Sequence, residues 1–217
     1  MRCTPCTRFI VIGILVLFVA VAQADFESEV IELVNAEREA CNCGLHPLSY
    51  NIELTVAARR HSQDMGDRNY FDHATPDGTP DGIAFYERIT DAGYIYQACG
   101  ENIAAGYATP EAVVDGWMNS DGHRANILDP DYCDIGVGYA AVDGSQYYHY
   151  WTQDFGRRAG VTQCPEPVAV PPATEAPVLS GSSDPGGGGG GGGCFIDASF
   201  TSGKLAVIVK NLLGSHD

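Results

Sequence analysis

Two short motifs carry side chains that could do chemistry. Glu101 lies in the run Gly-Glu-Asn-Ile (residues 100–103), and His123 lies in Gly-His-Arg-Ala-Asn-Ile-Leu (residues 122–128). The glycine beside each lets the backbone turn tightly or approach a ligand closely. A third candidate, His73, ends the run Tyr-Phe-Asp-His. Imidazole titrates near neutral pH and binds transition metals, so two histidines and a glutamate that converge would form a metal or proton-transfer site.

The same residues also have a purely structural interpretation. His73 and His123 would then be polar side chains that connect loops, and their spacing alone favours this interpretation. Glu101 is more informative, because a glutamate in a short, otherwise uncharged segment is costly to bury unless it is paired. An imidazolium or a metal ion would offset that cost. His61 and His149 are expected to be packing residues on a helix face and a strand face.

Several catalytic motifs are absent from the sequence. It contains no His-Glu-x-x-His zinc helix, no Gly-x-Ser-x-Gly nucleophile turn and no phosphate-binding loop. Acidic turns at residues 77–82 and 129–131 do not follow EF-hand spacing, and we interpret them as solvated turns. The missing nucleophile favours a binding protein over an enzyme.

The first 24 residues have the features of a secretory signal peptide. Arg2 and Arg8 form a basic start, residues 9–21 are continuously apolar, and Ala-Gln-Ala precedes a cleavage site between Ala24 and Asp25. The apolar run is short for a transmembrane helix. We therefore expect a secreted protein, extracellular or at the cell surface, with no transmembrane span in the mature chain.

The chain is strongly acidic, and its 217 residues suffice for one domain with appendages. It has 12 Lys and Arg and 28 Asp and Glu, a net charge of −16 at pH 7. Cleavage would remove Arg2 and Arg8 and no acidic residue, which leaves −18. This charge argues against nucleic acid and anionic membranes as partners and would attract divalent cations. The expected partner is a protein, a lipid or an envelope component.

The cysteine count indicates disulfides. Cleavage leaves an even number in an exported chain, at positions 41, 43, 99, 133, 164 and 194. We predict a Cys99–Cys133 bridge, because both residues border the predicted sheet. Cys41 and Cys43 are only two residues apart, so each is expected to pair elsewhere. Cys41, Cys43 and Cys164 are the cysteines that remain for a second bridge.

Apolar periodicity and capping signals predict four helices. The first three cover residues 25–39, 52–67 and 83–91, and Ser49 or Asn51 can cap the second. The fourth begins with Thr-Pro-Glu at residues 109–111 and ends near Asn119. That start combines a capping threonine, a proline in the first turn and an acid at the positive end of the helix dipole.

Strands are predicted at residues 101–105, 135–142 and 146–155. Asp-Gly-Ser at residues 143–145 would join the last two as a hairpin. Helices at the front, strands at the back and no regular βαβ alternation favour an α+β layered domain. We place this domain at residues 25–160.

The composition changes after about residue 160. Residues 161–193 are rich in proline and then in glycine, which predicts a disordered linker that cannot bury a core. Residues 194–217 form a short C-terminal segment in which charged residues interrupt the apolar ones, so it is no membrane span. Cys194 would be a free thiol, an intermolecular link or an attachment point.

Taken in order, the motifs resemble those of bacterial members of the CAP superfamily. This superfamily comprises the cysteine-rich secretory, antigen 5 and pathogenesis-related-1 proteins, and its domain is also called SCP. The resemblance covers about residues 28–157. The matching runs lie at residues 34–38, 61–65, 70–73, 100–104, 117–120, 122–128, 135–138 and 150–156.

The resemblance implies a three-layer α-β-α sandwich with a central cleft. In many members two histidines and two glutamates line this cleft and can hold a divalent ion, often zinc. By motif, His73, Glu101 and His123 match three of these four residues. The second glutamate follows a helical tryptophan in eukaryotic members, and it has no counterpart after Trp117, although Asp121 could compensate. Three ligands would still suffice for zinc with an open position.

The resemblance implies a mixed set of functions, because the fold alone does not define activity. We expect a secreted, non-enzymatic binding or interaction module with a His/Glu cleft that is able to hold Zn²⁺ or another divalent cation. One alternative is a metal-dependent, peptidase-like hydrolase, in which zinc on His73 and His123 activates water and Glu101 is base or ligand. The other is a sterol- or lipid-binding protein with a groove beside the cleft.

Overall fold

A four-stranded sheet forms the centre of the structure, a computed structural model that describes residues 26–77 and 82–171. The strands are β1 (Ser49–Tyr50), β2 (Tyr96–Ala105), β3 (Asp134–Ala141) and β4 (His149–Arg158). They lie in the order β1-β3-β4-β2. The sheet is mixed, because β1 is parallel to β3 while β4 is antiparallel to both β3 and β2.

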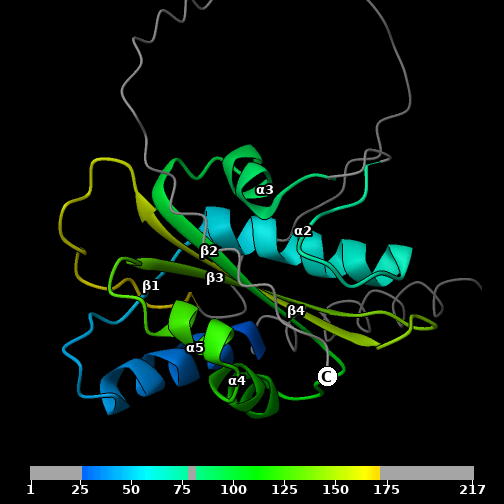
Figure 1. Ribbon diagram of the computed structural model, residues 1–217, viewed down its shortest axis with the longest axis horizontal. Helices are drawn as coiled ribbons and strands as arrows, with labels where there is room; N and C mark the ends of the chain where they lie inside the picture. The colour runs from blue at the N-terminus through cyan, green and yellow to red at the C-terminus, as the bar shows by residue number, and fades with distance from the viewer. Residues whose placement is uncertain (1–25, 78–81, 172–217) are drawn as a thin grey trace, which may run out of the picture.

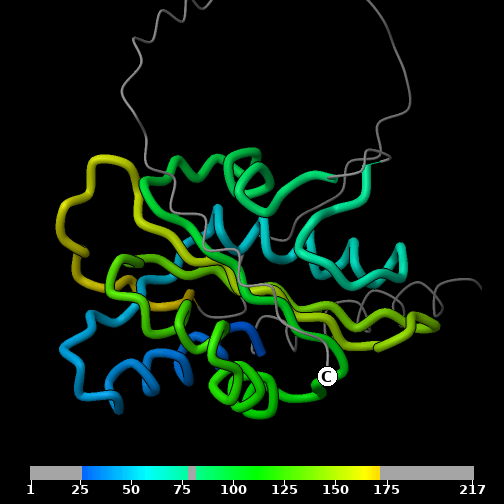
Figure 2. The backbone as a smooth tube through the Cα atoms, in the orientation of Figure 1, coloured from blue at the N-terminus to red at the C-terminus, as the bar shows by residue number. Residues whose placement is uncertain are grey.

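Helices cover both faces of this sheet (Figure 1). On one face lie α2 (Ile52–Arg68) and α3 (Phe85–Asp91). On the other lie the helix of residues 26–40, α4 (Pro110–Met118) and α5 (Asp121–Ile127). The backbone tube in Figure 2 shows that the helix of residues 26–40 lies beside α4 and α5, although they are far apart in sequence. The predicted α+β class is confirmed.

Local capping signals set the starts of the two longer helices after residue 50. The Asn51 side chain accepts a hydrogen bond from Leu54 N at 2.9 Å and caps α2, while Ser49 belongs to β1. The Thr109 side chain accepts one from Ala112 N at 3.3 Å and caps α4. All four predicted helices are confirmed within a few residues in the described part of the chain.

Short elements differ most from the sequence predictions. β1 has two residues and exists through its pairing with β3, and α5 is a seven-residue helix where no helix was predicted. β2 begins at Tyr96 instead of residue 101, and β4 begins at His149 instead of residue 146. Such elements take their stability from tertiary partners, so their sequences carry little periodic signal.

α2 packs directly on the backbone of β3. A Cβ atom on Gly136 would lie 2.2 Å from Thr55 N, and one on Gly138 would lie 2.2 Å from Arg59 N. Glycine at these two positions therefore permits an approach that any side chain would block. This contact sets the distance of α2 from the sheet face on which the candidate site lies.

Side chains, rather than another strand, cover the outer edge of β2. Donors from three residues reach alternate backbone carbonyls: Tyr132 OH to Cys99 O at 3.3 Å, Asn126 Nδ2 to Glu101 O at 3.2 Å and Trp117 Nε1 to Ile103 O at 3.3 Å. Carbonyls at a strand edge would otherwise lack partners and invite pairing with another chain. The Gly-Glu-Asn-Ile run is thus attached to α4 and α5 along its length.

The predicted Cys99–Cys133 bridge is wrong. Cys133 pairs with Cys164, and Cys99 is a buried free thiol. β4 separates the two predicted partners, because Gly156 of β4 pairs with Cys99 on one side and accepts a hydrogen bond from Cys133 N on the other. Two strand spacings, about 10 Å, exceed the Cα separation that a disulfide can bridge.

Cys41 and Cys43 pair with each other, which contradicts the expectation that each pairs elsewhere. The physical reason is the turn between them. Asn42 has a left-handed backbone with φ 52°, and the two cysteine Cα atoms lie 5.3 Å apart. Their separation in sequence is therefore no obstacle to a bond.

The first residues after position 160 contact the domain. Besides the Cys133–Cys164 bridge, Val168 N donates to Ser49 Oγ at 2.9 Å and Tyr50 N donates to Val168 O at 3.0 Å. The predicted signal peptide, the glycine tract and residues 194–217 with Cys194 lie outside the described residues. Among the residues described, no helix has the length and apolar character to cross a membrane.

Candidate functional site

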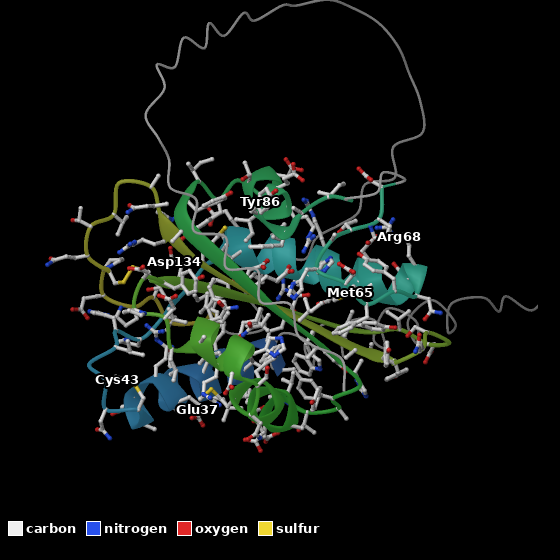
Figure 3. All side chains as sticks on the ribbon, viewed as in Figure 1. Glu37, Cys43, Met65, Arg68, Tyr86 and Asp134 are labelled. Carbon is white, nitrogen blue, oxygen red and sulfur yellow. A yellow bond between two sulfur atoms is a disulfide. The ribbon has the colours of Figure 1, made fainter. Side chains whose placement is uncertain are left out.

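His73 and Glu101, two of the predicted site residues, are in direct contact. The His73 Nδ1 atom lies 2.8 Å from Glu101 Oε1. The Glu101 side chain is 1% exposed and that of His73 is 44% exposed. A buried carboxylate therefore lies beneath an accessible imidazole. The loop that carries His73 connects α2 to α3. In Figure 3 the labels Met65 and Arg68 mark α2, and the label Tyr86 marks α3.

Arg88 of α3 is the second partner of Glu101, and sequence reasoning missed it. Its Nη2 atom donates to Glu101 Oε2 at 2.6 Å, and its side chain is 12% exposed. Burial alone would raise the pKa of Glu101, but Arg88 and then the His73 hydrogen bond outweigh it and lower this pKa to about 2. Glu101 is therefore ionised, with a nitrogen donor on each oxygen.

Asp154 is a second carboxyl group at this place that the sequence analysis did not select. It lies opposite Glu101 in the β2–β4 register and is 1% exposed. Its Oδ1 atom has no hydrogen-bond partner among the described residues. Burial, and then the charge of Glu101, raise the pKa of Asp154 well above its usual range. Asp154 thus favours its protonated form, and Glu101 carries the negative charge.

We call His73, Arg88, Glu101 and Asp154 the Glu101 cluster. Asp121, the sequence candidate for a compensating acid, is not part of it. Its side chain is 95% exposed and forms an ion pair with Arg124 on its own helix. The sequence did contain one signal for Asp154. It is the one acidic residue in the strand predicted at residues 146–155.

His123 lies on α5, which a buried amide network holds against β2. Asn102 Nδ2 donates to His123 O at 3.2 Å, and Asn126 Nδ2 donates to Asn102 Oδ1 at 2.8 Å. Burial, and then the charge of His73, lower the pKa of His123. Asn102 and Asn126, one from each motif, thus position His123, the third predicted site residue.

This network gives a testable prediction. Asn126→Leu keeps the size of the side chain but removes the donor to Glu101 O and Asn102 Oδ1, so we expect the free energy of unfolding to fall by about 2 kcal/mol. Urea denaturation of both proteins measures the difference. Asn119→Leu, at an exposed position, serves as the control. An Asn126→Leu protein as stable as the wild type would contradict the role of this network.

His61 is buried on α2, as predicted for a packing residue, and is 1% exposed. Its Nε2 atom lies 3.0 Å from Asp72 O, so Nε2 carries the proton, and Nδ1 lies 3.3 Å from the Thr75 hydroxyl. Burial lowers the pKa of His61 to about 4. The neutral ring therefore holds the start of the loop that carries His73.

The lowered pKa of His61 predicts a pH-dependent stability. Above pH 6.5 the ring is neutral in both states, whereas between pH 6.5 and 4 only the unfolded chain binds the proton, so stability falls as the pH falls. From pH 7.5 to 5 we expect His61 to contribute a loss of about 2 kcal/mol. Urea denaturation at both pH values, on wild type and His61→Gln, isolates this contribution. Equal pH slopes in the two proteins would refute it.

The metal ion implied by the family resemblance does not fit these residues. Among the residues described, no group of three or more His, Cys, Asp or Glu side chains could hold a metal ion. Both oxygens of Glu101 already accept nitrogen donors, from His73 and Arg88. The guanidinium would also repel a divalent cation at this carboxylate.

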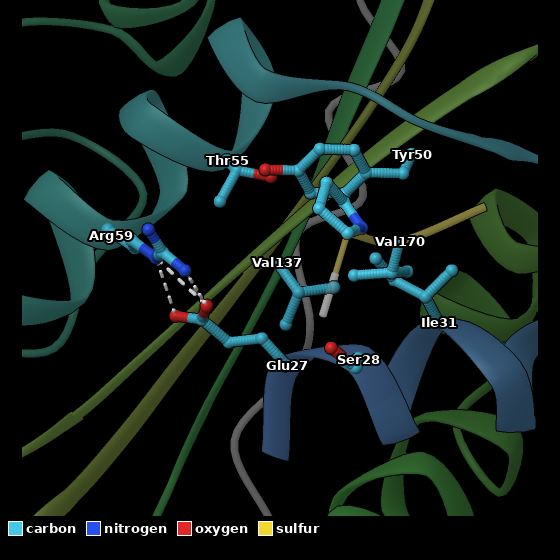
Figure 4. Close-up of a pocket in the computed structure, with 9 residues that line it drawn as sticks. Glu27, Ser28, Ile31, Tyr50, Thr55, Arg59, Val137 and Val170 are labelled. Atoms are coloured by element: carbon cyan, nitrogen blue, oxygen red, sulfur yellow. Dashed lines mark hydrogen bonds and ion pairs between the residues drawn. The ribbon is translucent and has the colours of Figure 1, made fainter. Parts of the chain in front are cut away.

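Two cavities lie on other parts of the described structure. The first, of about 10 Å³, is large enough for about one water molecule and lies between the helix of residues 26–40 and α2 (Figure 4). The ion pair of the buried Glu27 with the partly exposed Arg59 lines it, with Arg59 Nη2 2.5 Å from Glu27 Oε2. The second, about 450 Å³, is an open groove along β1 that includes Tyr50 and Val168. Neither is lined by the Glu101 cluster.

The comparison with protein families identifies the domain. The Cysteine-rich secretory protein family, CAP, matches residues 31–155, more than half of the chain. The chain therefore belongs to this family.

Individual relatives are bacterial. YkwD of Bacillus subtilis (strain 168) is 48% identical over 131 residues, which cover 60% of this chain and 46% of YkwD. The membrane protein YlbC of the same strain is 35% identical over 136 residues, which cover 63% of this chain and 36% of YlbC. This chain thus spans less than half the length of these curated relatives.

A solved structure supports the fold. An extracellular protein containing an SCP domain from Bacillus anthracis str. Ames aligns with a TM-score of 0.54 and 32% identity, over 63% of this chain and 41% of that one. An outer surface protein from Borrelia burgdorferi aligns with a TM-score of 0.51 and 20% identity, over 59% of this chain and 89% of that one, and shows the fold alone. A related domain thus occurs in an extracellular protein, and the same fold occurs in an outer surface protein.

Proposed function

We propose that this protein is a secreted binding module and that its recognition surface surrounds the Glu101 cluster. The observation that carries the proposal is the engagement of both Glu101 oxygens, by His73 at 2.8 Å and Arg88 at 2.6 Å. A carboxylate with a pKa of about 2 is a poor proton acceptor near neutral pH, which argues against Glu101 as a general base. The predicted signal peptide and the extracellular relative support secretion.

Exposed aromatic rings beside the His73 loop support a binding role. Phe71, Tyr147 and Tyr148 are 43%, 39% and 44% exposed, and the rings of Phe71 and Tyr147 lie 5.9 Å apart. Aromatic side chains are enriched at recognition surfaces and often dominate their binding energy. Tyr148 also has a backbone φ of 64°, a costly conformation for a bulky residue that suggests a functional constraint. We call the contacting pair Phe71 and Tyr147 the aromatic surface.

An envelope component is the partner that we assign to the aromatic surface of this secreted, strongly acidic protein. The test is co-sedimentation of the mature chain with purified bacterial cell walls. We expect the double variant Phe71→Ser/Tyr147→Ser to bind about tenfold more weakly. Ile95→Ser, which removes an even more exposed apolar side chain elsewhere, is the control and should bind as the wild type does. Equal binding by the double variant would exclude this surface.

A turnover assay separates binding from catalysis. We expect no hydrolysis of peptide or ester substrates by the pure mature chain, with or without added zinc. Hydrolysis that His123→Ala abolishes, while circular dichroism shows an intact fold, would contradict the proposal and favour the hydrolase alternative.

A further inference from the structure

Arg88 links the Glu101 carboxylate to the loop that carries His73. Its Nη1 atom donates to His73 O at 2.7 Å and to Ile83 O at 3.1 Å, and it lies 3.3 Å from Thr75 Oγ1. Its Nη2 atom donates to Glu101 Oε2 at 2.6 Å. One largely covered cation thus connects β2 to both sides of the loop between α2 and α3.

The donors beside this guanidinium are of the kinds that bind metal ions, although their present arrangement forms no group of three that could hold one. Glu101 contributes a carboxylate, Asp154 lies opposite it on β4, and the His73 imidazole contacts the other Glu101 oxygen. Carboxylates and imidazole are common ligands of divalent transition metals. A metal ion on Glu101 would compete with Arg88 for the same oxygen, and the two like charges would repel each other.

We propose that Arg88 is the resident cation of this site: it occupies the position that a divalent metal ion would need on Glu101 and positions His73, so the native protein is metal-independent. Arginine suits this role because its guanidinium stays charged and donates along several directions at once. It connects separate segments as a metal ion would, and it leaves no free carboxylate oxygen for one. This proposal holds whether the surrounding surface binds a partner or performs catalysis.

The proposal predicts that removal of the guanidinium creates a metal site. In Arg88→Met, Glu101 loses its cation, and the exposed His73 imidazole can rearrange with the freed carboxylate around a divalent ion. We expect equilibrium dialysis of the mature chain with metal analysis to show zinc bound about 100-fold more tightly to this variant than to the wild type. Zinc should also raise the thermal midpoint of the variant and leave that of the wild type unchanged. A cobalt-loaded variant should show visible absorption bands that the wild type lacks.

Three further proteins make the test specific. Arg88→Lys retains a positive charge and should restore the weak zinc binding of the wild type. Arg88→Met/His73→Ala should lose the gain, because one ligand is gone. If Arg88→Met does not fold, Arg88→Gln replaces it. Two results would overturn the proposal: stoichiometric zinc on the wild type that His73→Ala removes, or folded Arg88→Met and Arg88→Gln proteins that gain no zinc affinity.

Discussion

Gly138→Ala is expected to lower the free energy of unfolding by about 3 kcal/mol or more. The new Cβ atom would lie 2.2 Å from Arg59 N and 2.3 Å from Ala58 C, both in the backbone of α2. Backbone atoms in the middle of a helix cannot move aside as a flexible side chain can, so the whole helix must shift from the sheet. Because α2 precedes the His73 loop, the shift would also disturb the Glu101 cluster.

Urea denaturation of wild type and Gly138→Ala measures this effect. Gly144→Ala is the matched control, since it adds the same methyl group where no atom lies within 4 Å of the new Cβ. Gly144 has a φ of +80°, so backbone strain alone should cost about 1 kcal/mol there. Similar losses in the two variants would show that α2 does not pack on the β3 backbone as closely as described.

Arg38→Met is expected to lower the free energy of unfolding by about 4 kcal/mol. Arg38 is 1% exposed and lies in the helix of residues 26–40. Its guanidinium donates to three backbone carbonyls, namely His46 O at 2.8 and 2.9 Å, Ile127 O at 2.7 Å and Asp129 O at 3.0 Å. Methionine fills a similar volume but leaves these buried carbonyls without donors.

The Arg38 prediction also concerns the candidate site, because Ile127 ends α5, the helix that carries His123. The measurement is again urea denaturation, together with the NMR chemical shifts of the His123 ring. Arg60→Met, at an exposed position on α2, should change stability by less than about 0.5 kcal/mol. A loss in Arg38→Met no greater than in this control would mean that the network of Arg38 does not hold α5.

Much of the fold could be predicted from local sequence. Thr109 and Asn51 satisfy the first free N–H groups of α4 and α2 wherever these helices lie, so their signals do not depend on the tertiary structure. The motif order also indicated the family, and the match over residues 31–155 confirms it. The prediction that His73 and Glu101 share one cleft followed from this resemblance.

The disulfides could not be predicted in the same way. A bridge depends on the distance between two Cα atoms, and that distance follows from strand order. The order β1-β3-β4-β2 puts β4 between Cys99 and Cys133. Their positions at the borders of two strands did not reveal whether those strands are neighbours.

The family, the starts of α2 and α4, and the choice of His73, Glu101 and His123 as candidate site residues all followed from the sequence. The surroundings of Glu101, in contrast, depend on the packing of the folded chain. Arg88 lies in the short helix α3, and Asp154 lies on β4, 53 residues after Glu101 in the sequence. The residues around either position do not indicate that the two side chains lie close together. The β2–β4 register and the packing of α3 bring them together. A buried charge is stabilised by whatever lies within a few ångströms of it, and that distance is a property of the folded chain.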